Sequence, residues 1–307
     1  MTDPRTHVLL VGHGTVSDLD DLPAFLANIR QGRHVPAELV QHVRHRYEAI
    51  GGQSPLTAIA ERQAQMLEGR LGIPVHVAMR LWQPYVRDVV ASAVEAGARR
   101  IVSMPMAPFS VPLYHRTVDE AVALATAARG VELDVVRAPY WNEEPALIGL
   151  FADLVREALE RFPAGDRTSV GVVPSAHSLP TRTLREGDPY AALVARTAEL
   201  VVARACPDNP VAVAFQSQGA TPDPWLGPTL DECFRGLVAR GVRDVLIAPI
   251  GFLTDHVETL YDLDIEARPI AEAAGVRRLE RTRLPNDDPR LIDALEAVVR
   301  RALAPPS

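Results

Sequence analysis

The 307-residue sequence contains no lysine, and all 32 of its basic residues are arginine. This absence excludes a P-loop lysine, a Schiff-base lysine and a lysine general base. The 39 acidic residues outnumber the basic ones and give a net charge of −7. That balance disfavours nucleic acid as the main partner, because phosphate binding needs a cationic face. We therefore expect arginine to be the side chain that binds any anionic ligand.

Cysteine is almost absent as well. Cys206 and Cys233 are too few for a disulfide framework, form no CxxC zinc motif and cannot supply the thiolates of an all-cysteine iron–sulfur cluster. We expect neither a prosthetic group nor an iron–sulfur cluster. No apolar run approaches the roughly 20 residues of a membrane span, and the N-terminal run lacks the pattern of a signal peptide. The sequence therefore predicts a cytoplasmic protein without an integral membrane segment.

The residues that are present alternate between strand and helix patterns. Short β-branched runs predict buried parallel strands at His7–Gly12, Pro74–Leu81, Arg100–Pro105, Glu132–Arg137, Ser169–Pro174, Val211–Gln216, Asp244–Ile250 and Arg278–Arg283. Helical patterns lie between them at Leu22–Arg30, Ala37–Tyr47, Pro55–Leu71, Tyr85–Ala98, Leu113–Ala128, Pro145–Phe162, Tyr190–Ala205, Thr229–Arg240, Val257–Ala274 and Pro289–Ala302. This order is typical of an α/β protein with doubly wound parallel sheets, although eight strands can also close as a barrel.

A short internal repeat favours two domains over the barrel. Val8–Thr15 and Gly171–Ser178 each carry a histidine just past an apolar run, and Val102–Ser110 and Val245–Asp255 each run into a proline and a loop. We predict two Rossmann-like domains related by duplication, each a four-stranded parallel sheet flanked by helices. Their expected ranges are 1–145 and 146–307, with the last helix free to pack back on the first domain.

Ligands of such sheets bind at the carboxyl ends of the strands, so His13 and His177 are expected to face one cleft. A neutral imidazole can ligate a metal or accept a proton near neutral pH. Glu258, Asp262 and Glu266 follow another strand end and are spaced by four, which places them in one row on an α-helix. A row of like charges is stable when divalent cations or moving protons neutralise it, and a solvated acidic face is the ordinary alternative. We predict a metal or proton site here.

Two further segments indicate ligand binding. Ser54 and Pro55 fit a helix N-cap and first helical residue after a Gly-Gly pair, and Arg30, Arg33 and Arg46 are near in sequence. This predicts a site for carboxylates or phosphates. Phe215–Pro228, rich in proline and glycine around Trp225, predicts a rigid loop with a flat apolar wall, a packed turn being the alternative.

Four motifs spread over the whole chain together resemble the ferrochelatase family. They are IGGxSPL at Ile50–Leu56, SAHSLP at Ser175–Pro180, TPDPWLGP at Thr221–Pro228 after a Gln-Ser strand end, and PIGFxxDHxExLYDxDxE at Pro249–Glu266. The resemblance is closest to the compact coproporphyrin III ferrochelatases of Gram-positive bacteria. It implies a monomeric lyase of the metal-chelatase type that inserts Fe(II) into coproporphyrin III in haem biosynthesis and passes haem to an accepting partner protein.

The resemblance also implies roles for single residues. His177 and Glu258 would be the catalytic pair that handles the ferrous ion and the pyrrole protons. Asp262 and Glu266 would continue this metal-binding row toward solvent and offer a place for a regulatory or structural divalent cation. His13 would be an axial ligand of the product iron, where a relative carries tyrosine. The porphyrin propionates would be bound by five residues: Arg30, Arg46, Tyr47, Ser54 and Tyr114.

Two other departures from the family pattern are a glutamine, Gln31, in place of a second consecutive arginine, and a segment at Met106–Ser110 that is about three residues short and shifts the alignment of Tyr114. Three alternative functions remain: a protoporphyrin IX ferrochelatase, a related chelatase for cobalt and sirohydrochlorin, and a non-catalytic haem-binding protein. His13 favours the cobalt and sirohydrochlorin chelatase, but the chain length and the TPDPWLGP loop disfavour that alternative. A non-catalytic haem-binding protein would need neither a proton acceptor nor an acidic row.

Overall fold

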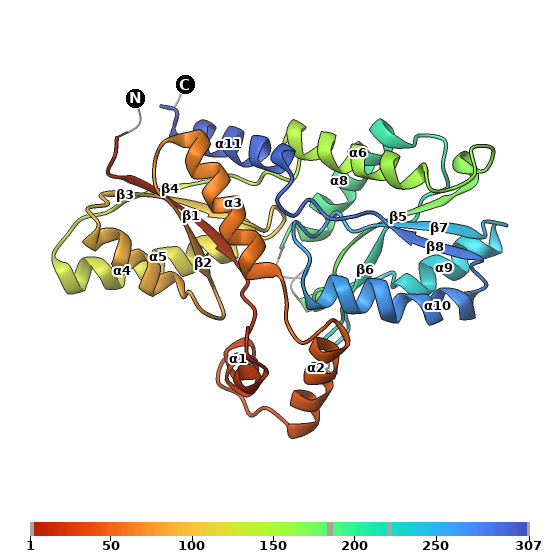
Figure 1. Cartoon of the computed structure of the whole chain (residues 1–307), viewed down its shortest axis with the longest axis horizontal. Coiled ribbons are helices and arrows are strands. Elements are labelled where there is room, and N and C mark those ends of the chain that lie inside the picture. The colour runs from red at the N-terminus through yellow and green to blue at the C-terminus, as the bar shows by residue number, and fades with distance from the viewer. Residues whose placement is uncertain (1–2, 183–186, 220–222, 306–307) are drawn as a thin grey trace. The chain divides into compact units, whose positions relative to one another are not determined.

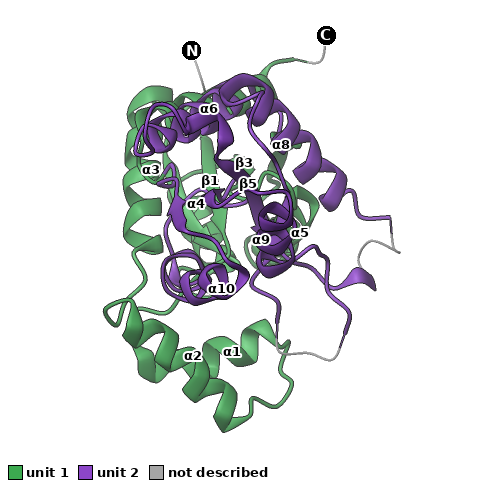
Figure 2. Ribbon diagram, turned by 90° about the vertical axis from the view of Figure 1, so that its right-hand side faces the viewer, with its two compact units in different colours: residues 1–141, 286–307 green, residues 142–285 purple. Residues whose placement is uncertain are grey.

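The computed structural model describes residues 3–182, 187–219 and 223–305, and the chain forms two compact units. Unit 1 consists of Met1–Trp141 and Asn286–Ser307, and unit 2 of Asn142–Pro285 (Figure 2). The first boundary lies four residues before the predicted one, and the chain returns to unit 1 after residue 285, which the prediction allowed for the last helix.

Unit 1 is built on a parallel sheet with the strand order β2-β1-β3-β4 (Figure 1). Its strands are β1 (Thr6–Gly12), β2 (Val75–Met79), β3 (Arg100–Pro105) and β4 (Asp134–Arg137). Its helices are η1 (Leu19–Asp21), α1 (Leu22–Ile29), α2 (Ala37–Ala49), α3 (Leu56–Leu71), α4 (Val86–Glu95), α5 (Val111–Arg129) and α11 (Pro289–Leu303). β1 is buried because both faces of the sheet are covered, which is why its sequence is apolar without alternation.

Unit 2 repeats this plan with the strand order β6-β5-β7-β8. Its strands are β5 (Gly171–His177), β6 (Ala214–Gln216), β7 (Asp244–Ala248) and β8 (Arg278–Arg281). Its helices are α6 (Pro145–Leu159), η2 (Arg167–Ser169), α8 (Tyr190–Ala205), α9 (Leu230–Ala239), η3 (Glu258–Glu266) and α10 (Ala267–Ala274). Each first strand therefore lies between the second and third strands of its own unit, and all pairs are parallel.

The matching strand order confirms the predicted α/β fold with two duplicated, four-stranded parallel sheets, and the barrel alternative is wrong. None of the described helices combines the length and the apolar character that crossing a membrane requires.

The last helix completes unit 1. Pro289 starts α11 just after Asp288, whose side chain caps the helix by accepting from the Arg290 backbone N–H at 3.0 Å. The apolar face of α11, which includes Leu291, Leu295 and Val298, is fully buried against α3, β3 and β4. The core of unit 1 therefore needs both ends of the chain.

Three predicted elements near the carboxyl edge of the unit 2 sheet differ from the structure. The helix predicted over Val257–Ala274 is a π-helix, η3, followed by α10, and the Ala267 N–H donates to the Asp262 carbonyl five residues back. The strand predicted over Ser169–Pro174 is β5, which continues to His177. β6 is shorter than predicted, with one isolated pairing of Val211 and Val172 beyond it.

Candidate active site

The candidate catalytic residues of unit 2 gather at the carboxyl edge of its sheet. His177 is the last residue of β5, Ser217 follows β6, and Glu258 begins η3 after the loop that leaves β7. β5, β6 and β7 are neighbouring parallel strands, so their carboxyl ends lie at one edge. Residues far apart in sequence are thereby brought together, as the sequence predicts for His177 and Glu258.

His177 and Glu258 form a close pair. Nε2 of His177 lies 3.4 Å from Oε1 of Glu258, and about a third of each side chain is exposed. Nδ1 of His177 lies 2.5 Å from the backbone oxygen of Ser178. A carbonyl oxygen can only accept, so Nδ1 carries a proton and Nε2 is the nitrogen that can exchange a proton or bind a metal. Tyr190 Oη donates to the backbone oxygen of His177 at 2.8 Å and further fixes this strand end.

The electrostatics of the pair favour a proton on His177. Burial alone would lower the pKa of the His177 imidazole, but the charge and hydrogen bond of Glu258, the bond to Ser178 and the charge of Asp262 raise that pKa to about 9. The imidazole is therefore protonated near neutral pH, and its proton is shared with Glu258. An arriving cation must displace that proton before it can bind Nε2.

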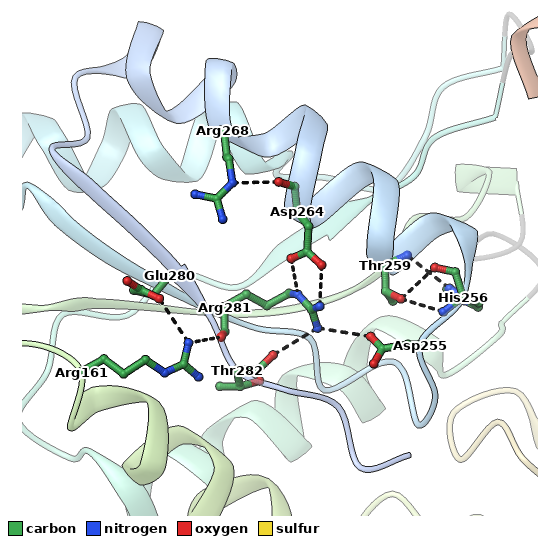
Figure 3. Close-up of polar contacts among 9 residues, drawn as sticks. All are labelled: Arg161, Asp255, His256, Thr259, Asp264, Arg268, Glu280, Arg281 and Thr282. Carbon is green, nitrogen blue, oxygen red and sulfur yellow. Dashed lines mark hydrogen bonds and ion pairs between the residues drawn. The ribbon is translucent and has the colours of Figure 1, made fainter. Parts of the chain in front are cut away.

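A second imidazole lies on the other side of Glu258. Nε2 of His256 is 3.8 Å from Oε2 of Glu258, and burial lowers the pKa of His256, helped by the nearby charge of His177. The Thr259 N–H donates to Nδ1 of His256 at 3.2 Å, and the Thr259 hydroxyl and the His256 backbone exchange further bonds (Figure 3). Because Nδ1 accepts, the neutral His256 carries its proton on Nε2, the atom that faces Glu258. One carboxylate thus lies between a charged and a neutral imidazole.

Arg281 fixes the η3 segment from its other side. Its guanidinium makes two bonds to Asp264, at 2.7 and 2.6 Å, a third to Asp255 at 3.5 Å and a fourth to the Thr282 carbonyl (Figure 3). Only 14% of the Arg281 side chain is exposed. Asp255 precedes His256 and Asp264 lies within η3, so one arginine of β8 holds the turn on both sides of Glu258.

A glycine sets the distance between this loop and β5. A Cβ atom on Gly251 would lie 2.6 Å from both Cα and Cβ of Ala176, the residue before His177. The Gly251 N–H donates to the Ser175 carbonyl at 3.0 Å. Any side chain at position 251 would push the β7 loop away from the end of β5, so glycine is required by close approach.

The predicted acidic row does not run steadily toward solvent. Glu258 is partly exposed, Asp262 is only 4% exposed, and Glu266 is exposed. Oδ2 of Asp262 accepts a hydrogen bond from Oγ of Ser217. Within the ranges that the structure describes, no group of three or more His, Cys, Asp or Glu side chains is arranged to hold a metal ion. The π-helical geometry of η3 accounts for the uneven burial, because positions four apart no longer follow the α-helical period.

The proline-rich loop is described only in part, since residues 220–222, which include the first two residues of the TPDPWLGP motif, lie outside the described ranges. Its later residues pair with the segment that follows His177: Pro180 and Trp225 form an antiparallel bridge, and the Leu226 N–H donates to the Leu179 carbonyl at 2.8 Å. Ser178 Oγ also donates to the Leu226 carbonyl. The loop is thus attached to the His177 strand end.

Two of the predicted site residues of unit 1, His13 and Tyr47, lie near the carboxyl end of β1. His13 directly follows β1 and is exposed, and its carbonyl accepts from the Leu81 N–H. Oη of Tyr47 is 2.7 Å from Oγ1 of Thr15 and is fully buried, which ties α2 to the chain just after His13. The Arg46 side chain next to it is partly exposed.

The other predicted residues of unit 1 have different surroundings. Arg30 is partly exposed just after α1, and its Nε donates to the His34 carbonyl at 2.9 Å. Ser54 Oγ accepts from the Leu56 N–H at 3.4 Å, and the cap position of α3 itself is Pro55, one residue later than predicted. Tyr114 packs in the hydrophobic core beside β1 and β3 with 7% exposure.

Several residues that shape the unit 2 site were absent from the predicted set: Ser217, Gly251, His256 and Arg281. The motif Pro249–Glu266 already contains Gly251 and His256, so the density of glycine and charge there was a usable signal. Ser217 lies in the Gln-Ser strand end that precedes the TPDPWLGP motif, but its pairing with Asp262 had no signal, and neither did Arg281, because the partners Asp262 and Asp264 are distant in sequence.

Comparison with known proteins agrees with the geometry. A family model described as Ferrochelatase matches residues 5–303. A ferrochelatase of Acidobacterium capsulatum is 38% identical, with 98% of this chain and 95% of the relative covered. Coproporphyrin III ferrochelatases of Geobacillus kaustophilus and Bacillus subtilis are 35% and 33% identical, each with 99% of this chain and at least 98% of the relative covered.

Solved structures support the fold alone. SirB from Bacillus subtilis, solved with Fe3+, aligns with a TM-score of 0.61 at 13% identity over 97% of this chain and 96% of SirB. The match of the family model over nearly the whole chain, together with relatives above 30% identity, decides the family. The chain belongs to the ferrochelatase family, and it is a lyase of the metal-chelatase type that inserts iron into a porphyrin.

Proposed function

We propose that this protein inserts Fe(II) into coproporphyrin III, and that His177 and Glu258 carry out the metal and proton steps. The observation that carries the proposal is the pair itself: Nε2 of His177 lies 3.4 Å from Glu258, while Nδ1 is held by the Ser178 carbonyl. Relatives at 33–35% identity that are named coproporphyrin III ferrochelatases support the choice of porphyrin.

Insertion replaces two pyrrole N–H protons by one divalent cation, so the site must take up protons and guide the metal. The carboxylate of Glu258 accepts a proton, and the neutral His256 beside it presents its Nε2–H to that carboxylate. Nε2 of His177 becomes a metal ligand once its own proton leaves. The charge of Asp262, buried nearby, attracts the cation and opposes its escape.

Unit 1 supplies the groups for the propionates in this proposal. Arg30 and Arg46 are partly exposed cations, and arginine matches a carboxylate with two parallel N–H donors. Ser54 offers a hydroxyl at the start of α3, where the helix dipole favours an anion. Tyr47 contributes indirectly, since its buried hydroxyl holds α2 against Thr15. Four propionates on coproporphyrin III need more such donors than the two of protoporphyrin IX.

The test of the substrate is a comparison of initial rates with Fe(II) under anaerobic conditions, using coproporphyrin III and protoporphyrin IX. We expect kcat/KM to be at least about tenfold higher for coproporphyrin III. Arg46→Ala should lower this ratio by raising KM for coproporphyrin III. Equal kcat/KM values for both porphyrins would contradict the coproporphyrin assignment, whereas absence of turnover with either would contradict the enzyme.

We further propose that His13 ligates the product iron. Its exposed position just past β1 leaves the imidazole accessible, and neutral imidazole is a stronger-field ligand than the phenol of a relative's tyrosine. The ferric product bound to the wild type should then show more low-spin character than when bound to His13→Ala. Identical ferric spectra for the two proteins would exclude the axial role.

A further inference from the structure

Ser217 has a backbone conformation that is rare for a residue with a side chain. Its φ is +61°, in the left-handed region that favours glycine, and such conformations persist in proteins mainly where surrounding structure imposes them. Ser217 follows Gln216, the residue of β6 that pairs with His177, and the Ser178 N–H donates to the Gln216 carbonyl at 2.7 Å. The strained residue therefore lies one step beyond the strand position beside His177.

Gln216 itself is held firmly. Its side chain is 4% exposed, and Oε1 accepts from Oγ of the fully buried Ser175 at 2.8 Å. The carbonyl of Gln216 is thus held by Ser178, which directly follows β5, and the Gln216 side chain is held by Ser175 of β5. A residue placed so firmly has little freedom to relax its φ, which explains how the strain is maintained.

The side chain of Ser217 has one described partner of special interest, Asp262 of η3. Oγ of Ser217 donates to Oδ2 of Asp262, which is buried, and the two residues are 45 positions apart in sequence. A charge-assisted hydrogen bond to one oxygen of a carboxylate restricts rotation of the whole group. The loop after β6 and the π-helix η3 are thereby joined through a carboxylate rather than through apolar packing.

We propose that Ser217 is a positioning residue for metal capture, whose hydroxyl orients the carboxylate of Asp262 toward the entering cation. The inference rests on the proposed function, in which Asp262 attracts the metal. A carboxylate that rotates freely must be ordered when the cation binds, which costs conformational entropy. A hydrogen bond that orients the carboxylate beforehand removes this cost from the binding step. The strained φ at position 217 is the structural cost of placing the hydroxyl there.

Two substitutions separate positioning from simple structural support. Ser217→Ala and Ser217→Gly remove the same hydroxyl, but only glycine relieves the left-handed backbone. We expect Ser217→Gly to melt at a higher temperature than Ser217→Ala. We also expect both to raise KM for Fe(II) by the same factor, about five- to tenfold, with kcat and the KM for porphyrin changed by less than about twofold.

If Ser217 were merely structural, activity would follow stability, and Ser217→Gly would be clearly more active than Ser217→Ala. That result would overturn the inference, as would an unchanged KM for Fe(II) in both variants. Ser169→Ala, which removes an exposed hydroxyl that bonds only to the Asp166 carbonyl among the described residues, is the control and should leave all kinetic constants unchanged.

The Asp262→Asn variant tests the role of Asp262 in metal capture separately from the positioning role of Ser217. A raised KM for Fe(II) in Asp262→Asn, with no change in either Ser217 variant, would reject Ser217 as a positioning residue and leave the proposed role of Asp262 intact. Wild-type kinetics in Asp262→Asn would reject that role of Asp262, and with it the inference. A similar rise in KM for Asp262→Asn and both Ser217 variants is the expected result.

Discussion

At the scale of single residues, the chemistry of unit 2 depends on one carboxylate between two imidazoles. Burial lowers the pKa of His256, whereas Glu258, the Ser178 carbonyl and Asp262 outweigh the effect of burial on His177 and raise its pKa to about 9. Two chemically identical side chains thus take opposite protonation states near neutral pH. That separation places a charged imidazole on one side of the Glu258 carboxylate and a neutral imidazole on the other.

Removal of either partner of the pair should therefore abolish most of the activity. We expect His177→Ala and Glu258→Gln each to lower kcat by more than about tenfold, a loss above roughly 1.4 kcal/mol of transition-state stabilisation, without unfolding the protein. Initial-rate measurements, with circular dichroism to verify folding, check this. Glu199→Gln, an exposed position on α8, is the control and should retain full activity. A folded His177→Ala or Glu258→Gln with more than a tenth of wild-type kcat would refute the assignment.

A second histidine pair, which has no part in the proposed chemistry, affects stability. His7 Nδ1 and His76 Nε2 lie 2.9 Å apart between β1 and β2. Burial lowers the pKa of both imidazoles, and for His7 the neighbouring His76 lowers it further, from an ordinary value of 6.5. A hydrogen bond between two ring nitrogens needs one acceptor, so at least one ring must be neutral.

The lowered pKa values of His7 and His76 determine how stability depends on pH. The unfolded chain binds protons on these histidines at higher pH than the folded chain does, so their stabilising effect is complete above pH 6.5 and is lost as the pH falls below it. We expect the urea midpoint to fall between about pH 7.5 and about pH 5, and His76→Gln to reduce that fall. His42→Gln, on the exposed side of α2, should not reduce it. An equal fall in His76→Gln and wild type would contradict the explanation.

At the scale of elements, the short strand β8 controls the geometry of η3 through Arg281. The planar guanidinium makes two parallel bonds to Asp264 that an ammonium group cannot reproduce. Arg281→Lys retains the positive charge, and we expect it to lower the free energy of unfolding by about 1–2 kcal/mol, measured in urea.

The matched control for this prediction is Arg235→Lys. Arg235 also bonds both oxygens of one aspartate, Asp231, but its side chain is 60% exposed and belongs to a single turn of α9. Water competes for that pair, so the loss of unfolding free energy should be clearly smaller than at position 281. If both substitutions lowered the free energy of unfolding equally, burial of the Arg281 hydrogen bonds would contribute nothing to stability.

At the scale of the whole molecule, unit 2 is one continuous segment, whereas unit 1 is assembled from two. A fragment of residues 142–285 should unfold cooperatively on its own. A fragment of residues 1–141 should lack cooperative unfolding, because the surfaces of α3, β3 and β4 that α11 covers would be exposed. Addition of a peptide of residues 286–307 should restore the transition. Cooperative unfolding of residues 1–141 alone would contradict the structural division.

The sequence by itself determined the order of strands and helices, the duplication of the sheet and the strand-end positions of His13, His177 and Glu258. These features depend on local periodicity and on the rule that neighbouring parallel strands end at one edge, both of which are read along the chain. The motifs in the segments around Ser54, His177 and Glu258 also identified the family.

Only the tertiary structure decided how the site is held. It replaced the predicted α-helical row by the π-helix η3, buried Asp262 and paired it with Ser217, and brought Arg281 to Asp264. It also decided that α11 belongs to unit 1, a possibility that the sequence left open, and it required glycine at position 251 because Ala176 leaves no room for a Cβ. Each of these depends on contacts between residues distant in sequence, and the energy of such contacts is set by packing and burial that no local pattern records.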